Sequence, residues 1–366
     1  MALDRITLAS FRNHRASAID GTAQFNLLVG ENGAGKTNVL EAISLFAPGR
    51  GLRRAALTDM AGNAGPGGFT VSARLAQPGE AEPVVLGTGT EAAQPGRRLV
   101  QINSAPTSAV SLGEWLALTW LTPAMDRLFA DSAGARRRYM DRLALALAPG
   151  HARAAARHES ALRERNRLLS APHDPDPRWL DAVEMQLAQA GAALAQGRAA
   201  LVERLSAELA TLPEEPFALP LLTYVPGGPL EAEILAEALA AGRRRDRAAQ
   251  RTLTGPQRDE LEVSMAGKGD DGKGQPAALC STGEQKAMLI AITLAHAALA
   301  AGERPGLLLL DEVAAHLDPL RRAALFDRLR SGKAQIWLTG TELPPFAEIR
   351  EEAACWRVAA GQVERV

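Results

Sequence analysis

The stretch GENGAGKTN, residues 30–38, decides the fold of this chain. It follows the mostly apolar run FNLLV, residues 25–29, and leads into VLEAISLFA, residues 39–47. The first segment predicts a buried strand, and the second, which ends before Pro48 and Gly49, predicts a helix. A glycine-rich loop between a strand and a helix presents backbone N–H groups and the helix N-terminus to an anion. The stretch therefore predicts a phosphate-binding loop.

The loop matches the pattern G-x-x-x-x-G-K-[ST], in which the backbone cradles phosphate oxygens, the lysine reaches the β- and γ-phosphates and the hydroxyl holds Mg²⁺. Only 5 of the 41 basic residues are lysines. One of them stands in the loop, where a planar guanidinium would not fit the phosphate nest. We expect a nucleoside triphosphate with Mg²⁺, bound by Gly30, Glu31, Asn32, Gly33, Ala34, Gly35, Lys36, Thr37 and Asn38.

A second apolar run, GLLLL at residues 306–310, ends in the adjacent carboxylates Asp311 and Glu312. Two carboxylates at the end of a buried strand would be costly without a cation. Asp311 is therefore the second predicted ligand of Mg²⁺, together with Thr37. Glu312 is predicted to polarise the attacking water, so that Lys36 and Glu312 are the predicted catalytic residues.

Composition and charge are those of an ordinary globular chain. The 366 residues are 46% hydrophobic with a net charge of −1, which allows two or three domains and gives no global basic field for nucleic acid. Cys280 and Cys355 are too few for a disulfide framework or a zinc site. No apolar run approaches the roughly 18 residues of a membrane span, and no signal peptide opens the chain, so we expect a cytoplasmic protein without a membrane partner.

The alternation of patterns predicts an α/β nucleotide-binding fold interrupted by helices. Residues 1–130 hold the phosphate loop, a first strand over residues 3–11 and Gly- and Pro-rich pieces that predict a β-subdomain. Residues 131–250 form the predicted helical lobe. Residues 251–366 return to α/β alternation, with predicted strands at LEVSM, GLLLL, AQIWL and CWRVAA and helices near 283–301 and 319–331.

The helical lobe is predicted to be a short hairpin. Its two helical segments, residues 135–170 and 177–211, are separated by APHDPDP, whose prolines cannot continue a helix. Leucines recur every seven residues in the second segment, but Gly191 and Arg198 interrupt the stripe. The interrupted pattern therefore predicts a short helical hairpin and not a long coiled coil.

A third motif, STGEQ, opens the long apolar helix predicted near residues 283–301. Its serine hydroxyl, backbone amides and helix N-terminus suit an anion. A second phosphate-binding end indicates a second nucleotide or a second subunit. The motif supplies the candidate residues Ser281, Gly283 and Gln285.

The STGEQ motif resembles the signature motif of the ABC ATPase superfamily, and AAHLDP, residues 314–319, resembles the D-loop that follows the catalytic glutamate. The resemblance implies that the nucleotide is ATP and that two chains form a head-to-tail homodimer around two ATP molecules. It also implies that Ser281, Gly283, Gln285 and Asp318 contact nucleotide across that interface.

LASFRNH (8–14), WLTPAMDRLF (120–129), ARRRYMDRL (135–143) and TGPQRDEL (254–261), together with the STGEQ and LLLLDE segments, resemble the RecF family of bacterial recombination-repair ATPases over essentially the whole chain. The fold this implies is an ABC-type P-loop ATPase head, similar to that of SMC proteins, with a β-subdomain and an inserted short coiled-coil-like lobe.

The function implied by this resemblance is ATP-dependent binding to gapped DNA with single-strand to double-strand junctions. It includes weak, DNA-stimulated ATP hydrolysis, help for RecO and RecR in loading RecA, and a link to the SOS response. By analogy with related heads, Arg12 and Asn13 either contact the nucleotide or form a strand-end salt bridge and cap.

Some features depart from these patterns. The glutamine and histidine of transport ABC proteins are missing, and the corresponding places, residues 119–126 and 339–341, leave the γ-phosphate-sensing residues open. Gln257 stands where the RecF family is expected to carry histidine. A transporter subunit remains an alternative, disfavoured by these absences. A structural SMC head is a further alternative, but it would need long heptad arrays.

Clusters of arginine are candidates for contacts to DNA phosphates. The alternative is a set of solvated faces, because acidic residues are interleaved and few aromatic residues are available to stack on bases. The candidates are Arg136, Arg137, Arg138, Arg153, Arg157, Arg163, Arg165, Arg167, Arg243, Arg244, Arg245 and Arg247.

Overall fold

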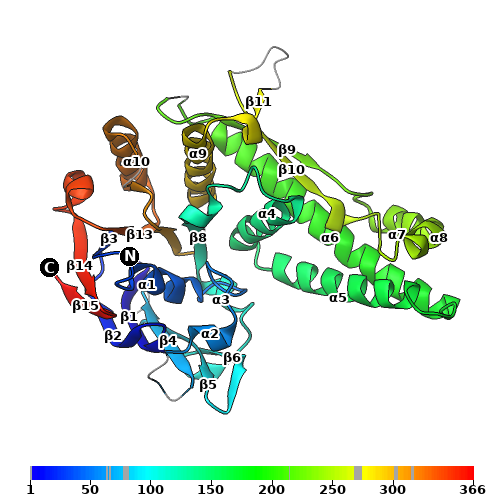
Figure 1. Cartoon of the computed structure of the whole chain (residues 1–366), viewed down its shortest axis with the longest axis horizontal. Helices are drawn as coiled ribbons and strands as arrows, with labels where there is room; N and C mark the ends of the chain where they lie inside the picture. The colour runs from blue at the N-terminus through cyan, green and yellow to red at the C-terminus, as the bar shows by residue number, and fades with distance from the viewer. Residues whose placement is uncertain are drawn as a thin grey trace. The chain divides into compact units, whose positions relative to one another are not determined.

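The structure is a computed structural model that describes residues 2–62, 65, 67–76, 82–213, 215–267, 274–300, 304–314 and 317–366. It contains two compact units (Figure 1). The first comprises Met1–Asp126, Glu214–Phe217 and Leu289–Val366, and the second Arg127–Pro213 and Ala218–Met288. The predicted boundary at residue 250, between the helical lobe and the C-terminal part of the head, stays a prediction. In the structure, the described residues between 251 and 288 belong to the second unit.

The first unit contains a sheet whose order is β15-β14-β3-β13-β12-β8, parallel except for the edge pair of β14 and β15. Every residue of β3, β13, β12 and β8 is buried, as expected of a parallel sheet covered on both faces. The strands are β15 Gln362–Arg365, β14 Ala353–Ala359, β3 Phe25–Val29, β13 Gln335–Gly340, β12 Gly306–Leu310 and β8 Ala117–Leu121. Strand β13 therefore separates the phosphate-loop strand β3 from β12, the strand that Asp311 follows.

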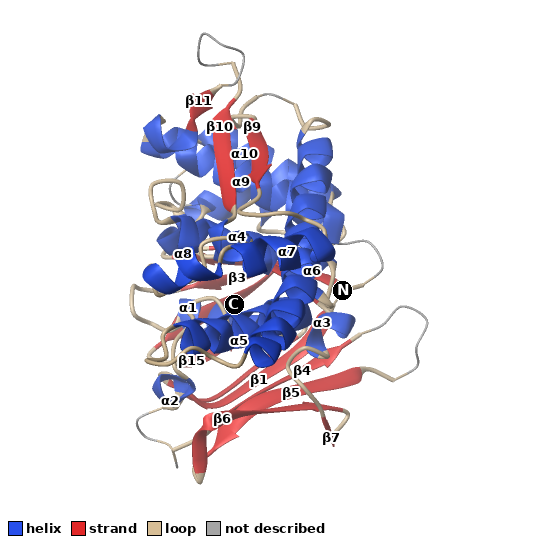
Figure 2. Cartoon of the chain, turned by 90° about the vertical axis from the view of Figure 1, so that its right-hand side faces the viewer, coloured by secondary structure: helices blue, strands red, loops and turns tan. Residues whose placement is uncertain are grey.

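A second sheet of this unit is antiparallel and confirms the predicted β-prone pieces, with the order β2-β1-β4-β5-β6-β7. Figure 2 shows β1, β4, β5 and β6 side by side. The strands are β1 Leu3–Phe11, β2 His14–Asp20, β4 Phe69–Leu75, β5 Val84–Glu91, β6 Gln94–Ile102 and β7 Ala105–Pro106.

Helix α1, Lys36–Ser44, begins inside the phosphate loop and carries the apolar residues Val39, Leu40 and Ile43. All three are fully buried in one core that includes residues of both sheets. The other helical pieces of this unit are α2 Leu57–Met60, α3 Leu112–Trp115, η1 Pro123–Met125, α10 Pro319–Ser331 and η5 Pro344–Ile349. Helix α9, Thr282–Ala300, begins in the second unit and ends in the first.

The second unit is mostly helical. Its helices are α4 Ala133–Leu147, α5 His151–Leu169, α6 Pro177–Leu209, α7 Ala232–Ala241, α8 Arg243–Ala248, η2 Pro256–Arg258 and η3 Ala277–Leu279. A three-stranded sheet, ordered β11-β10-β9, consists of β11 Gln275–Pro276, β10 Glu260–Met265 and β9 Pro220–Val225. Helices α5 and α6 lie side by side and form the predicted hairpin (Figure 1).

One prediction about this unit is wrong. The segment 135–170 is not a single helical run, because α4 ends at Leu147 and α5 starts at His151. Pro149 lies between them, and proline lacks the N–H that a continuing helix would need. The predicted leucine stripe of α6 is buried. Arg198, which interrupts the stripe, is also buried, and its guanidinium donates hydrogen bonds to the carboxylates of Asp141 and Asp259.

Arg165 of α5 has no exposed surface and links α5 to three other helices, α6, α7 and α8. Its Nε donates to Glu184 of α6 at 2.9 Å, its Nη1 to Asp246 of α8 at 2.7 Å, and its Nη2 to the carbonyl oxygen of Leu239 at 2.8 Å. The prediction that Arg165 contacts DNA is therefore wrong. A buried guanidinium between two buried carboxylates holds the helices of the second unit together.

We predict that Arg165→Leu lowers the free energy of unfolding by about 3–5 kcal/mol, because it removes the close ion pair of the buried Asp246 and leaves the buried Glu184 with Arg243 alone. Denaturant unfolding of the full chain, followed by circular dichroism, measures this loss. The control is Arg163→Leu in the same helix, whose ion pair with Glu159 is exposed and worth about 1 kcal/mol or less. Equal losses in the two variants would show that the buried cluster is not essential.

Candidate nucleotide-binding and catalytic site

The phosphate loop connects the end of β3 to the start of α1. Its tip is exposed at Glu31, Asn32 and Gly33, so the backbone there is accessible to a ligand. A Cβ atom on Gly30 would lie 2.1 Å from the carbonyl oxygen of Val358, and Gly35 has a φ of +119°. Only glycine satisfies both the close approach and the left-handed conformation. The glycines of the motif are thus required by the surrounding backbone.

Three polar contacts fix the outer side of the loop. Asn13 donates its amide to the carbonyl oxygen of Ala34 at 2.9 Å. The Nε2 of His14 lies 3.0 Å from the carbonyl oxygen of Gly35, and burial lowers the pKa of His14. The backbone N–H of Gly361 donates to Ala34 at 2.9 Å. The loop is therefore held from the β1–β2 turn, from β2 and from the β14–β15 turn.

Lys36 is the predicted phosphate-binding lysine, and its side chain is buried within the loop. Its Nζ donates to the carbonyl oxygens of Gly30 at 2.7 Å and Glu31 at 2.9 Å. Desolvation lowers the pKa of Lys36, while the negative charges of Glu312 and Asp311 raise it. The ammonium is thus placed between the loop backbone and the two carboxylates.

Thr37 and Asp311 lie together as predicted. The Thr37 hydroxyl donates to Asp311 Oδ1 at 2.9 Å, and the hydroxyl of Thr339 donates to the same oxygen at 2.8 Å. Burial raises the pKa of Asp311, the two hydroxyl contacts lower it, and the charge of Glu312 raises it. A buried carboxylate beside a hydroxyl provides the hard oxygen ligands that Mg²⁺ prefers, so these residues fit the ion.

Sequence reasoning missed a buried acid in α1. Glu41 has no exposed surface and accepts two hydrogen bonds from Arg12, from Nε at 2.9 Å and from Nη2 at 2.8 Å. Arg53 also donates to Glu41, at 2.9 Å, and to Asn38 at 2.6 Å. Arg12 thus forms a salt bridge, and Asn13 braces the loop. The signal in the sequence is an acid within the apolar run of α1.

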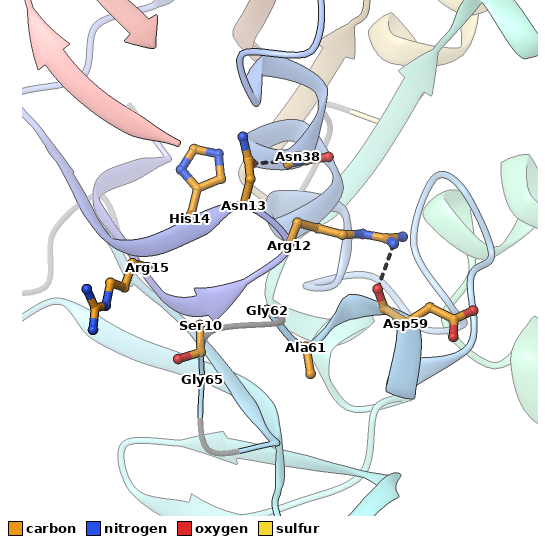
Figure 3. A pocket seen from close by; sticks show the side chains of 10 residues that line it. All are labelled: Ser10, Arg12, Asn13, His14, Arg15, Asn38, Asp59, Ala61, Gly62 and Gly65. Carbon is orange, nitrogen blue, oxygen red and sulfur yellow. Dashed lines mark hydrogen bonds between the residues drawn. The ribbon is translucent and has the colours of Figure 1, made fainter. Parts of the chain in front are cut away.

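A cavity of about 470 Å³ adjoins the loop (Figure 3). Arg12 and Asn13 line it, as do Asn38 of α1 and Asp59 of α2. The amide of Asn38 donates to Asn13 at 2.7 Å, and Arg12 Nη1 donates to the carbonyl oxygen of Asp59 at 2.7 Å. The cavity volume is typical of small-molecule sites, and its polar lining suits the ribose and base of a nucleotide.

The C-terminal end of α1 is also fixed. Arg98 of β6 donates to the carbonyl oxygen of Gly49 at 2.6 Å, to that of Leu45, and to the hydroxyl of Thr88 at 2.9 Å. Burial lowers the pKa of Arg98 to about 10. A cation at a helix C-terminus interacts favourably with the helix dipole. Helix α1 is therefore anchored at its phosphate-binding end and at its far end.

The STGEQ motif lies in the second unit, at the N-terminus of α9. Ser281 and Glu284 form a capping box, with Ser281 N and Oγ 2.9 Å and 3.0 Å from Glu284 Oε2. Ser281 and Gly283 are exposed, whereas Gln285 is buried and donates to the carbonyl oxygen of Cys280 at 2.9 Å. Their predicted contact with a second nucleotide stays a prediction.

Asp318 of the predicted D-loop is the N-cap of α10 and accepts a hydrogen bond from Arg321 N at 2.9 Å. Residues 315–316 of that loop lie outside the described residues. The role of Asp318 toward nucleotide also stays a prediction.

Comparison with known proteins places the chain in a family. The family model for the RecF/RecN/SMC N terminal domain matches residues 2–355. The DNA replication and repair protein RecF of Mesorhizobium japonicum is 47% identical over 379 residues, covering 99% of this chain and 97% of that protein. RecF of Brucella suis biovar 1 is 43% identical over 380 residues, covering 99% and 96%.

Two solved structures share the fold. The recombination mediator protein RecF-ATPrS in the RecFOR pathway has a TM-score of 0.86 at 20% identity, covering 100% of this chain and 98% of that one. The Smc head domain of Pyrococcus furiosus with an extended coiled coil has a TM-score of 0.54 at 14% identity, covering 100% and 96%. The predicted fold of the head, similar to that of SMC proteins, is thereby confirmed. Among the described residues, no helix has both the length and the apolar character needed to cross a membrane.

We predict that Asp311→Asn raises the melting temperature of the nucleotide-free, EDTA-treated protein at neutral pH. A carboxyl whose pKa is higher in the folded than in the unfolded chain reduces stability above that pKa, and the cost disappears as the pH falls through it. The gain should therefore shrink on acidification. Asp20→Asn, at an exposed ion pair, is the control with little effect. A variant less stable than wild type at neutral pH would contradict this account.

Proposed function

The chain belongs to the RecF family of DNA replication and repair proteins, and from this premise we propose that it is an ATP-dependent DNA-binding protein of recombinational repair and replication restart. The observation that carries the proposal is the assembly of Lys36, Thr37, Asp311 and Glu312 at one end of the parallel sheet. Family membership favours this function over a transporter subunit or a structural SMC head.

The residues around the phosphate loop support ATP as the nucleotide. The triphosphate lies along the backbone of residues 30–38, with the adenosine in the cavity lined by Arg12, Asn13 and Asn38. Thr37 and Asp311 would hold Mg²⁺, which would neutralise charge on the phosphate oxygens. A solved structure of similar fold is described as RecF-ATP, which agrees with this choice.

Hydrolysis follows from the two predicted catalytic residues. Glu312 accepts a proton from the attacking water, and the water oxygen attacks the γ-phosphorus as the bond to ADP breaks. Lys36 compensates the negative charge of the phosphates. Because Lys36 Nζ already donates to the carbonyl oxygens of Gly30 and Glu31, it is in place before ATP binds. The products are ADP and phosphate, released slowly unless DNA stimulates the reaction.

The exposed start of α9 supports an ATP-dependent homodimer. Ser281 and Gly283 are exposed at the positive end of a 19-residue helix, where Ser281 donates its N–H and its hydroxyl to Glu284. In the proposed head-to-tail dimer this end, together with Gln285 and with Asp318 of the D-loop, contacts the γ-phosphate held by the other protomer. ATP binding then closes the dimer, and hydrolysis opens it.

DNA contacts fall to the arginines that no carboxylate occupies. Arg136, Arg163, Arg167, Arg243 and Arg247 form ion pairs. Within the described part of the chain, Arg138, Arg157 and Arg244 are exposed and form no ion pair. These three are the proposed contacts to DNA phosphates at gaps and junctions.

RecO and RecR are the proposed protein partners, which load RecA in the cytoplasm, with a link to the SOS response. A solved structure of similar fold, described as part of the RecFOR pathway, supports this choice.

We predict that Lys36→Arg abolishes ATP-dependent dimerisation, because the guanidinium cannot occupy the space between the Gly30 and Glu31 carbonyl groups. Sedimentation of the full chain with and without ATP and Mg²⁺ measures the dimer. The control is Lys333→Arg, at an exposed position. A Lys36→Arg variant that dimerises like wild type would sink the assignment of the nucleotide site.

Glu312→Gln is expected to bind ATP, to lose hydrolysis by about 100-fold or more, and to remain dimeric after ATP is mixed in. The amide cannot accept the proton of the attacking water. Glu342→Gln, at an exposed position, should behave as wild type. If the Glu312→Gln dimer dissociates as fast as the wild-type dimer, hydrolysis does not open the dimer.

A further inference from the structure

Thr339 lies at the carboxyl end of β13, between the strand of the phosphate loop and the strand of the acidic pair. Leu338 pairs with Leu310 of β12, and Thr339 itself pairs with Leu28 of β3. The next residue along β12 is Asp311, so the register places Thr339 level with it. The side chain of Thr339 has no exposed surface.

The hydroxyl of Thr339 contacts both members of the acidic pair. It donates to Asp311 Oδ1 at 2.8 Å and accepts a hydrogen bond from the backbone N–H of Glu312 at 2.9 Å. A threonine hydroxyl has one hydrogen, and the carboxylate of Asp311 takes it. The Thr339 hydroxyl is therefore not available to sense a γ-phosphate, although the resemblance to transport ABC proteins places a sensor at residues 339–341.

The backbone of Glu312 needs support. Its φ is +54°, a left-handed conformation that residues other than glycine seldom adopt. Such conformations persist only where the surrounding structure determines them, and they cluster at functional sites. The hydrogen bond from Glu312 N to Thr339 is the contact that holds this backbone in place. The conformation sets the direction in which the Glu312 side chain leaves the end of β12.

We propose that Thr339 is a positioning residue for ATP hydrolysis, which orients the Asp311 carboxylate for Mg²⁺ and the Glu312 backbone for activation of water through one hydroxyl. This inference rests on the proposed function. Strand β13 thereby becomes the third strand that contributes to the site, after β3 and β12, because Thr339 fixes the two residues that follow β12. The hydroxyl of Thr37 in α1 donates to the same oxygen of Asp311. Two hydroxyls, one from a helix and one from a strand, therefore hold that carboxylate.

Thr339→Val tests the proposal because it keeps the shape and removes the hydroxyl. In steady-state kinetics, kcat should fall by at least about ten-fold while KM for ATP changes little, since misplaced catalytic groups cost rate. A fluorescent ATP analogue, titrated with Mg²⁺, gives a second readout. The Mg²⁺ concentration for half-saturation should rise by about ten-fold, as when the partner of a metal ligand is removed.

Thr339→Ser should restore both quantities, because serine supplies the same hydroxyl. The matched control is Thr293→Val in helix α9, a buried threonine whose hydroxyl donates to the carbonyl oxygen of Leu289 at 2.7 Å. It should leave kcat and the Mg²⁺ titration unchanged. If Thr339→Val does not fold, Thr339→Cys, with a weak donor and acceptor of similar size, gives the same comparison.

The outcomes distinguish a failure of the proposed function from a failure of the positioning role of Thr339. If wild type hydrolyses no ATP, the proposed function fails, and the Mg²⁺ titration still tests the hold of Thr339 on Asp311. If wild type hydrolyses ATP and Thr339→Val matches it in kcat and in Mg²⁺ requirement, the positioning role is overturned. Equal losses in the valine and serine variants would also overturn it, since the hydroxyl would not be the cause.

Discussion

The carboxylate of Asp311, buried at the end of β12, is the feature on which the nucleotide site depends. One of its oxygens accepts hydrogen bonds from Thr37 of α1 and Thr339 of β13, so a single atom joins three elements. Burial raises the pKa of Asp311, the hydroxyl contacts of Thr339 and Thr37 lower it, and the charge of Glu312 raises it. Keeping such a group in the folded chain costs stability, and a divalent cation bound there would offset that cost.

The strand order of the parallel sheet explains why Thr37, Thr339 and Asp311 meet. With β13 between β3 and β12, the carboxyl ends of the three strands meet at one edge, and the residues that follow them converge there. The phosphate loop is then fixed from outside by contacts that leave its exposed tip accessible, such as those from Asn13 to Ala34 and from Gly361 to Ala34. The site is thus largely formed before a ligand arrives, which lowers the entropy cost of binding.

The sequence predicted the local features well and the long-range partners poorly. Strands β3 and β12, the loop and helix α1 follow from short apolar patterns and glycine spacing, and the pairing of Thr37 with Asp311 follows from the motif. The burial of Arg165 and the role of Thr339 could not be predicted. Arg165 stands in a polar, arginine-rich helix that looks like a solvated face, and its partners lie 19 and 81 residues away. The contacts of Thr339 depend on strand order, which periodicity does not specify.

The central claim is that the ATP site governs contact with DNA. The most direct measurement is the fluorescence anisotropy of labelled gapped DNA mixed with the protein and ATP, ADP or no nucleotide, at one fixed salt concentration. The account predicts tight binding with ATP and much weaker binding in the other two states. Equal binding in all three states, or none in any state while ATP still binds, would contradict it and would direct attention to a protein partner instead.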